Sequence, residues 1–401
     1  MNQPQSDPTT RLPSNIWKMY LYHGFWDGSL AFPLPIIVLF WQDNGLSMTQ
    51  IMGLQAIFAA TVVVLEVPSG YLADQVGRRF TLIISAIAMA IAMVIYSLSY
   101  GFAGFLLAEL IFALGISLYS GADAALIYDT LVDLEQSERY QQVWGNVFFY
   151  SKIVVAGANI AGGLLGKVNL RAAWYPGLAF ALLSIVAAAW LTEPTRHKRV
   201  LKESHWRDLL RILKYALLEN KPLRWLLLYA GVILTATQTG LWFYQPYFQL
   251  TGLDLAYFGL IFAVFNLVTA LSSKYAHRLE TYLGRRMALI LLIVILALGY
   301  FLMGQVIFSL SFIFVFFHQF VRGFAGVVLT DYINQQVESD IRATVLSVRS
   351  LLGRLVYTSF LPLAGWLADR YGLTTALLWM GVITLVAGGP ILGLLRRSRV
   401  I

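Results

Sequence analysis

The stretch Glu66-Val-Pro-Ser-Gly-Tyr-Leu-Ala-Asp-Gln-Val-Gly-Arg-Arg79 begins inside an apolar run and ends in a charged turn, just before the next apolar run opens. A tight connection between two membrane helices needs a small residue where the helices cross and a residue that tolerates a left-handed turn. Gly70 and Gly77 meet these needs without steric cost. Asp74 is placed to accept hydrogen bonds from the free amides of a helix N-terminus, where negative charge is favoured.

The composition of the chain is that of a membrane protein. Of its 401 residues, 58% are hydrophobic and only 12% are charged, and the mean hydropathy is +0.68. A soluble domain is about half apolar and about a quarter charged. The net charge of +8 arises mostly from basic residues in short loops between apolar runs, which indicates membrane topology and argues against a nucleic-acid partner. The absence of cysteine excludes disulfides and thiolate metal sites.

The apolar runs predict transmembrane helices, because a span needs about 20 apolar residues. Backbone groups in lipid must be satisfied within the segment, and these runs are too long for barrel strands, so we expect an all-α membrane protein. Twelve runs are long enough: 15–41, 48–72, 80–99, 103–132, 141–166, 172–192, 222–246, 255–277, 286–304, 308–335, 343–367 and 374–395.

The distribution of basic residues predicts the orientation. With the N-terminus inside, most of the 29 Lys and Arg residues fall in cytoplasmic tails, loops and span ends, including Arg78 and Arg79 at the lipid headgroup level. Three fall outside: Lys167, Arg171 and Arg370. We therefore expect both termini in the cytoplasm.

The chain divides by sequence into two six-helix bundles with polar segments around them. We expect a cytoplasmic N-terminal tail at 1–14 and a first bundle at 15–192. A cytoplasmic linker at 193–221 should lead to the second bundle at 222–395, and a basic C-terminal tail should follow at 396–401. The linker has the pattern of a basic amphipathic helix on the anionic inner leaflet, and it also joins the two bundles.

The two halves repeat each other. Three motifs recur at offsets of 207, 203 and 203 residues: Gly77-Arg-Arg79 at Gly284-Arg-Arg286, Glu135-x-x-Glu-Arg139 at Glu338-x-Asp-Ile-Arg342, and Gly162-x-Leu164 at Gly365-x-Leu367. Such recurrence predicts pseudo-symmetric bundles with a substrate site between them. The second copy of the loop is degraded, with Thr281 at the position that matches Asp74.

The chain resembles the major facilitator superfamily over nearly its whole length. The resemblance lies in the pattern Gly-x-Leu-Ala-Asp-x-x-Gly-Arg-Arg at 70–79, the twelve apolar runs and the two halves. Within the superfamily, the chain is most similar to bacterial drug and small-molecule efflux members. The resemblance implies an alternating-access transporter, multi-pass in the cell (inner) membrane, and we expect a monomer. It also implies that Asp74 caps the start of span eleven and that Arg78 pairs with Asp129, so that these residues, with Gly70, Gly77 and Arg79, latch the outward-facing state.

Two positions depart from the efflux members. In those members the fourth span carries a mid-membrane arginine a few residues before a glycine, whereas this chain has Ile111 ahead of Gly115. In the fifth span of those members a Gly-Pro-x-x-Gly-Gly motif stands where this chain reads Gly157-Ala-Asn-Ile-Ala-Gly-Gly163, without proline.

Ionisable residues inside spans are candidate functional residues, because each costs at least about 2.5–3.5 kcal/mol on insertion scales. Asp27, Glu109 and Arg322 are the first candidates for substrate or proton binding, since spans one, four and ten line the cavity in the superfamily. The alternatives are a structural pair of Asp27 with Lys152 or His23, and a permanent bridge for Arg322. Further candidates are Glu66, Lys152, Arg354, His23 and His318; for Glu66 packing or gating is the alternative, and for both histidines a hydrogen-bonded cavity role.

Aromatic residues are expected to line the same cavity, among them Trp26, Trp242 and Tyr244. An aromatic cavity with few charges suits an amphipathic organic molecule or a cation held over ring faces. The alternative is that these rings face lipid or pack between helices.

The leading hypothesis is proton-coupled efflux of small organic molecules, with the lipid bilayer and the substrate as partners. Sodium is the alternative coupling ion, held by Asp27 with carbonyls near Pro33 and Pro35. Three arginines, Arg322, Arg349 and Arg354, motivate an importer or organic-anion carrier instead, and a non-transporting receptor or scaffold is a further alternative. The chain has no phosphate-binding loop, nucleophile elbow or His cluster at ligand spacing, so we expect no enzyme, no cofactor and no metal site.

Overall fold

The computed structural model describes residues 12–195, 211–338 and 341–398, and every regular element in these ranges is helical. The all-α prediction is confirmed. The chain divides into two compact units. The first unit comprises Met1–Gly45, Ile57–Val200 and Leu255–Ala263, and the second comprises Leu46–Ala56, Leu201–Asp254 and Val264–Ile401.

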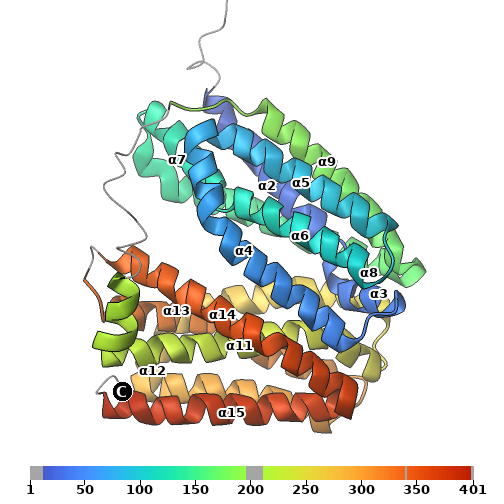
Figure 1. Cartoon of the computed structure of the whole chain (residues 1–401), viewed down its shortest axis with the longest axis vertical. Coiled ribbons are helices and arrows are strands. Elements are labelled where there is room, and N and C mark those ends of the chain that lie inside the picture. Colours follow the sequence, from blue (N-terminus) through green and yellow to red (C-terminus); the bar gives the residue numbers. More distant parts are fainter. Residues whose placement is uncertain (1–11, 196–210, 339–340, 399–401) are drawn as a thin grey trace, which may run out of the picture. The chain divides into compact units, whose positions relative to one another are not determined.

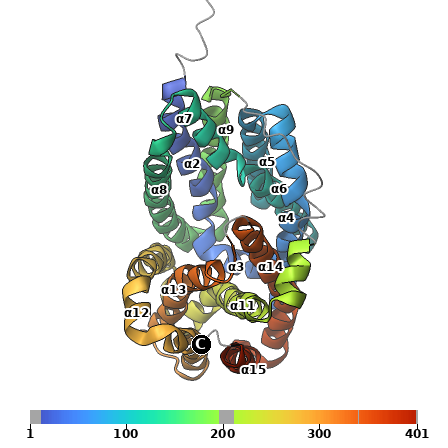
Figure 2. The same cartoon turned by 90° about the vertical axis from the view of Figure 1, so that its left-hand side faces the viewer.

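The first unit is a bundle in which α2 packs against α8 and α9, and α5 packs against α6 and α9 (Figures 1 and 2). Its helices, with α4 shared between the units, are η1 (Leu12–Ser14), α2 (Asn15–Ala31), η2 (Leu34–Ile36), α3 (Ile37–Asp43), α4 (Met48–Val76), α5 (Arg78–Leu98), α6 (Gly101–Tyr119), α7 (Ala122–Asp133), η3 (Ser137–Arg139), α8 (Tyr140–Val168), η4 (Leu170–Ala173) and α9 (Trp174–Trp190).

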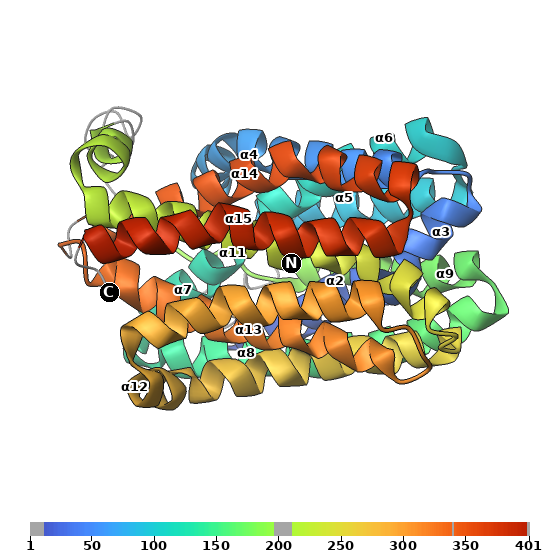
Figure 3. The same cartoon turned by 90° about the horizontal axis from the view of Figure 1, so that it is seen from below.

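The second unit is organised around α11, which contacts α13, α14 and α15 (Figure 3). Its helices, with η6 and the start of α12 belonging to the first unit, are the π-helical turn η5 (Tyr215–Glu219), α11 (Lys221–Leu250), η6 (Leu255–Tyr257), α12 (Phe258–Gln305), η7 (Ser311–Phe314), α13 (Val315–Asn334), α14 (Arg342–Tyr371) and α15 (Leu373–Arg397).

Eleven helices among the described residues are long and apolar enough to cross a membrane. One of them, Leu255–Gln305, has 51 residues. A straight helix of that length would be about 77 Å long, more than twice the hydrocarbon core of about 30 Å. The helix is interrupted at Gly284, whose φ of +74° is not helical. It therefore covers two predicted spans, 255–277 and 286–304.

Several predicted spans differ in detail from the observed helices. The first is divided between α2, η2 and α3, because Pro33 and Pro35 cannot donate the backbone bonds of a continuous helix. The fourth is divided between α6 and α7 at Gly121, whose φ is +89°. The second is longer than predicted: α4 runs to Val76, so Asp74 lies in the last turn of a helix and not in a loop.

One buried hydrogen bond occurs in both halves at the repeat distance. The Tyr22 hydroxyl donates to the carbonyl of Leu82 at 3.2 Å, and the Tyr229 hydroxyl donates to the carbonyl of Leu289 at 2.5 Å. Donor and acceptor are both displaced by 207 residues, the offset of the Gly-Arg-Arg motif, and both tyrosine side chains are fully buried. The internal repeat seen in the sequence thus extends to the way the first helix of each half is tied to the third.

The predicted amphipathic helix of the linker lies mostly outside the described residues. Within the described part, residues 211–214 are helical and lead into η5. Most of the N-terminal tail and the end of the basic C-terminal tail likewise lie outside the described ranges.

Candidate functional site

Polar side chains from three segments of the first unit meet beside α2. We call His23, Asp27, Tyr119, Asp123 and Ser151 the Asp27 cluster. The Asp27 carboxylate accepts a hydrogen bond from the Ser151 hydroxyl of α8 and one from the Tyr119 hydroxyl of α6 at 3.4 Å. The Tyr119 hydroxyl also lies 2.6 Å from His23 Nδ1. The Tyr119 hydroxyl thus joins His23 to Asp27, both on α2.

Local structure explains why these side chains meet. His23 and Asp27 are four residues apart, so they lie on the same face of α2. The left-handed turn at Gly121 ends α6 directly after Tyr119 and starts α7 just before Asp123. The Asp123 carboxylate is fixed at the start of α7 by the amides of Gly121 at 3.1 Å and Ala124 at 2.6 Å. The break in the helix therefore directs both Tyr119 and Asp123 towards α2.

The second nitrogen of His23 faces a carboxylate without touching it. His23 Nε2 lies 3.7 Å from Asp123 Oδ2, beyond hydrogen-bond distance, and it has no hydrogen-bond partner among the described residues. The His23 side chain is buried, with 4% of its surface exposed. When Nδ1 accepts the Tyr119 proton, the neutral ring carries its own proton on Nε2, on the side of Asp123.

Aromatic rings surround the cluster. Trp26 stacks on Tyr119 with ring centroids 4.0 Å apart and an interplanar angle of 3°, and its indole N–H donates to the Ser85 hydroxyl at 3.2 Å. Trp144 of α8 meets the His23 ring edge-on at 5.5 Å. These contacts hold the Tyr119 and His23 rings in one orientation, which keeps the hydroxyl between Asp27 and His23.

Three other predicted residues of the first unit have different surroundings. Lys152 is placed with its ammonium 4.8 Å from the centre of the Phe148 ring, whereas Asp27 bonds to the neighbouring Ser151. Glu66 is exposed on α4. Glu109 is buried and accepts a hydrogen bond from the Tyr96 hydroxyl. Glu109 precedes Tyr119 by ten residues, so the two residues are about 15 Å apart along the axis of α6. The structure does not bring Glu109 into the Asp27 cluster.

The second unit has its own buried histidine. His318 Nδ1 lies 3.1 Å from the Tyr244 hydroxyl, and its Nε2 lies 3.2 Å from the carbonyl oxygen of Leu296. The ring fits between two glycines, because a Cβ at Gly240 or at Gly299 would lie 2.9 Å from it. With both nitrogens paired and no free space beside the ring, this arrangement favours a fixed packing role for His318 and Tyr244.

The remaining candidates of the second unit have different surroundings. The indole N–H of Trp242 donates to the Tyr357 hydroxyl at 2.8 Å, which ties α11 to α14. Arg322 is exposed on α13 within its unit, and Arg354 is partly buried on α14. Arg349 donates to the Thr330 hydroxyl at 2.5 Å.

The stretch at 66–79 forms an ion pair and a turn within the first unit. Arg78 Nη1 lies 2.6 Å from Asp129 Oδ2, the pair that the family resemblance implies. Gly77 has a φ of +113°, as expected of a left-handed turn. Gly70 lies inside α4 and Asp74 is exposed within its unit. The latching role of these residues stays a prediction.

Sequence reasoning missed the acid that caps α5. Glu193 accepts from the backbone amides of Arg78 and Arg79, both at 2.8 Å, and the Arg79 guanidinium donates to the carbonyl of Ala189 at 2.7 Å. A carboxylate on two free amides at a helix N-terminus is favoured by the helix dipole. The only sequence signal was an acid directly after the sixth apolar run, which is also typical of an ordinary linker.

Removing this cap is expected to weaken the first unit. Glu193→Ala should lower the free energy of unfolding by about 1 kcal/mol, the usual loss for an N-terminal cap, whereas Glu138→Ala, at an exposed acid of η3, should leave it unchanged. Thermal unfolding of the detergent-purified variants measures both. Equal melting temperatures for the two variants would contradict the capping role of Glu193.

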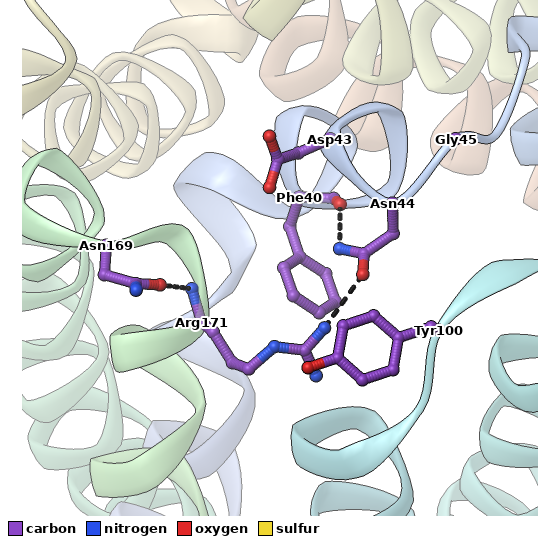
Figure 4. A pocket seen from close by; sticks show the side chains of 7 residues that line it. All are labelled: Phe40, Asp43, Asn44, Gly45, Tyr100, Asn169 and Arg171. Atoms are coloured by element: carbon purple, nitrogen blue, oxygen red, sulfur yellow. Dashed lines mark hydrogen bonds between the residues drawn. The ribbon is translucent and has the colours of Figure 1, made fainter.

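An open pocket of the first unit is organised by Arg171 (Figure 4). Its guanidinium donates to the carbonyls of Ser97 at 2.7 Å and Ser99 at 3.1 Å, and to Asn44 Oδ1 at 2.8 Å, and it lies 4.2 Å from the centre of the Tyr100 ring. A cation bound to the last carbonyls of a helix stabilises its C-terminus. Arg171 therefore joins the end of α5 to α3 and η4. The pocket is lined by Phe40, Asp43, Asn44, Gly45, Tyr100, Asn169 and Arg171.

Solved structures of transporters are similar to this chain in fold. A mutant of the nucleoside transporter NupG aligns with a TM-score of 0.82 at 14% identity, covering 96% of this chain and 99% of that chain. The peptide transporter POT in complex with sulfate aligns with a TM-score of 0.73 at 13% identity, covering 98% and 99%. A POT family transporter in complex with 5-aminolevulinic acid aligns with a TM-score of 0.71 at 13% identity, covering 96% of this chain and 97% of that chain.

The comparison with curated proteins finds no match. The sequence itself matches the Major Facilitator Superfamily over residues 24–356 and, in a second match, over residues 235–400. These matches cover most of the chain, and the many apolar helices agree with them. The protein is thus a multi-pass membrane transporter and not an enzyme, and it belongs to the Major Facilitator Superfamily.

Proposed function

We propose that the protein is a proton-coupled secondary transporter that exports small amphipathic organic molecules by alternating access. The observation that carries this proposal is the Asp27 cluster. In this cluster the Asp27 carboxylate of one spanning helix accepts hydrogen bonds from hydroxyls of two others. A second carboxylate, Asp123, lies on the other side of the His23 ring. A carboxylate within a span is costly and is usually kept for a proton or substrate.

Protonation of Asp27 would change the contacts between helices. The ionised carboxylate only accepts hydrogen bonds, and it accepts them from Ser151 and Tyr119. A protonated Asp27 is itself a donor on one oxygen, so one of these two hydroxyls must turn away or accept instead. Binding and release of one proton would therefore alter how α2 is tied to α8 or to α6.

The cluster also offers a path for the proton. Asp27 gives its proton to the Tyr119 oxygen as the Tyr119 proton passes to His23 Nδ1, and the proton on His23 Nε2 then passes to Asp123. Each group ends with the number of bonds it can hold. One proton has moved from Asp27 to Asp123, and the negative charge has moved from Asp123 to Asp27. The gap of 3.7 Å between His23 Nε2 and Asp123 must shorten or be bridged by water for the last transfer.

The rings around the cluster support the substrate class. Trp26 and Trp144 give the site flat apolar walls beside two carboxylates, which suits molecules with an apolar body and a polar or cationic end. The structural neighbours include nucleoside and peptide transporters, so small organic solutes are compatible with this fold.

The cellular setting follows from the basic residues of the sequence. We infer the cell (inner) membrane as the location, with both termini in the cytoplasm, and a monomer whose partners are the lipid bilayer and the substrate. The proton is the proposed coupling ion, and sodium bound at Asp27 is the alternative. No nucleic acid, cofactor or metal is part of the proposal.

The proposal is tested in proteoliposomes with a pH-sensitive dye inside. Adding candidate amphipathic amines should start proton movement across the membrane, and an imposed proton gradient should drive accumulation of the same compounds. A sodium gradient applied at constant pH should drive none. Binding of a compound without its movement under either gradient would favour a receptor, and accumulation driven only by sodium would replace the proton as coupling ion.

A second candidate function is import of organic anions. The observation that favours it is Arg322, exposed within its unit on a spanning helix. Uptake of a carboxylate-bearing solute that is lost in Arg322→Gln but kept in Asp27→Asn would support this function over efflux.

A further inference from the structure

The pattern of the 66–79 stretch occurs a second time, at the far end of the chain. Gly70-Tyr-Leu-Ala-Asp-Gln-Val-Gly77 and Gly365-Trp-Leu-Ala-Asp-Arg-Tyr-Gly372 share every position of Gly-x-Leu-Ala-Asp-x-x-Gly. The two copies are 295 residues apart, so they are not partners in the internal repeat of about 205 residues. The last glycine of each has positive φ, +113° at Gly77 and +81° at Gly372, and each stands between two long helices.

The aspartate of the second copy binds a helix N-terminus. Asp369 Oδ1 accepts from the amide of Met48 at 2.9 Å, and Oδ2 accepts from the amide of Thr49 at 2.8 Å. The other two free donors are satisfied locally, since the Ser47 amide donates to Gln50 Oε1 at 3.0 Å and the Gln50 amide donates to Ser47 Oγ at 3.3 Å. Charge-assisted bonds of a carboxylate to helix amides are among the stronger ones in proteins.

A glycine one turn earlier lets the carboxylate reach these amides. A Cβ at Gly365 would lie 2.5 Å from the carbonyl oxygen of Met48 and 2.7 Å from Thr49 Cα. Gly365 and Asp369 are four residues apart and therefore on one face of α14. The same face of α14 thus supplies both the close backbone approach and the acid, and both contact the first two residues of α4.

The start of α4 belongs to a different unit from the rest of that helix. Leu46–Ala56 groups with the second unit, whereas the chain from Ile57 onward groups with the first. Asp369 therefore binds the segment Leu46–Ala56, which connects on both sides to the first unit. Movement of one unit against the other would act on this segment. Asp74 lies 26 residues after Met48 in the same helix, two residues before its end.

At the position equivalent to Asp369, the other half has a glycine and not an acid. By the repeat offset of 203 residues, α8 carries Gly162 where α14 has Gly365, and Gly166 where α14 has Asp369. At that crossing Gly163 approaches the backbone of Gly259, at the start of α12, and a Cβ at Gly166 would lie 3.1 Å from Leu255 Cδ2. The carboxylate of Asp369 on helix amides therefore has no side-chain counterpart at Gly166.

We propose that Asp369 is a releasable cap that ties the start of α4 to α14 in one state of the transport cycle and releases it in the other. The inference rests on the alternating-access part of the proposed function. Asp369 is a positioning residue: it contacts no substrate, and its bond sets the relative population of the two states. Because the released carboxylate and the released amides are both hydrated, the bond can break and re-form in each cycle.

The chain contains no cysteine, so two spin labels can be placed without background. Labels at Ile57→Cys and Arg370→Cys, both exposed positions, report the distance between α4 and the end of α14 in the full-length protein. Asp369→Asn keeps the side-chain shape and removes the charge. It should increase the population with the longer distance about tenfold relative to the parent. The matched control is Asp43→Asn, which removes an exposed charge shortly before α4 and should leave the populations unchanged.

Hydrogen exchange distinguishes local release of the start of α4 from a general folding defect. In Asp369→Asn the amides of 46–56 should exchange about tenfold faster, while those of 80–98 keep the parent rate. Unchanged distances and unchanged exchange in Asp369→Asn would overturn the cap, as would equal shifts in Asp43→Asn. Absence of proton movement in the dye assay would remove the proton-coupled function but leave these two readouts intact, so the two failures are distinguishable.

Discussion

Replacing Asp27 by asparagine should uncouple proton movement from transport and lower substrate-driven proton flux by about 5- to 150-fold, the range of a coupling free energy of 1–3 kcal/mol. Asparagine has nearly the same shape and still accepts a hydrogen bond from Ser151 or Tyr119. It cannot gain or lose a proton, so the contacts of α2 with α8 and α6 no longer depend on protonation. Substrate binding, measured by thermal shift, should persist.

The matched control for Asp27→Asn is Glu109→Gln. Both variants change a carboxylate within a span of the first unit into an amide. Glu109 bonds to Tyr96 and lies outside the Asp27 cluster, so Glu109→Gln should keep proton coupling and lower thermal stability. Tyr119→Phe removes the hydroxyl between Asp27 and His23 and should slow the proton flux without stopping substrate binding. Normal coupling in Asp27→Asn, or its loss in Glu109→Gln, would refute the assignment.

The second large effect is expected from a single methyl group at Gly162. A Cβ there would lie 1.8 Å from the carbonyl oxygen of Phe32 and 2.7 Å from its carbonyl carbon, so the α8 backbone must move away from the chain after α2. Gly162→Ala should therefore lower the free energy of unfolding by about 3 kcal/mol, the upper part of the usual range for overpacking. Because Ser151 lies three turns earlier on the same face of α8, its bond to Asp27 should weaken as well.

Gly157 provides the control on the same helix. A Cβ at Gly157 would meet no described atom within 4 Å, and alanine is favoured over glycine inside a helix by up to about 1 kcal/mol. Gly157→Ala should therefore be neutral or slightly stabilising. Denaturant unfolding of the two variants in detergent measures the difference, and proton flux measures the effect on the site. Similar stabilities for both would show that α8 does not depend on the contact at Gly162.

Several features followed from the sequence because they depend on short segments. Apolar runs of about 20 residues predicted the all-helical membrane fold, since lipid forces each segment to satisfy its own backbone. The glycine at position 77 predicted a left-handed turn, which the structure has. The boundaries were less predictable. Gly70 does not interrupt α4, so the helix continues to Val76, and the turn at Gly77 ends it.

The pairing of charges was decided by tertiary structure. The sequence placed Asp27, Lys152 and Glu109 within spans of the first half, but which of them meet depends on how each helix is rotated about its axis. The rotation of α8 presents Ser151 to Asp27 and places Lys152 over a ring, and Glu109 lies too far along α6 to reach the cluster. Helix rotation is set by packing between segments more than 100 residues apart, which no local pattern records.

By itself the sequence determined that this chain is a transporter of the Major Facilitator Superfamily, built from apolar helices with a glycine turn at 77 and an internal repeat, because these properties belong to local composition and spacing. Only the tertiary structure decided that Glu193 caps α5, that Asp369 caps α4, and that Tyr119 joins His23 to Asp27. Each of these bonds needs two segments held within about 3 Å, and their separation along the chain ranges from about a hundred to more than three hundred residues.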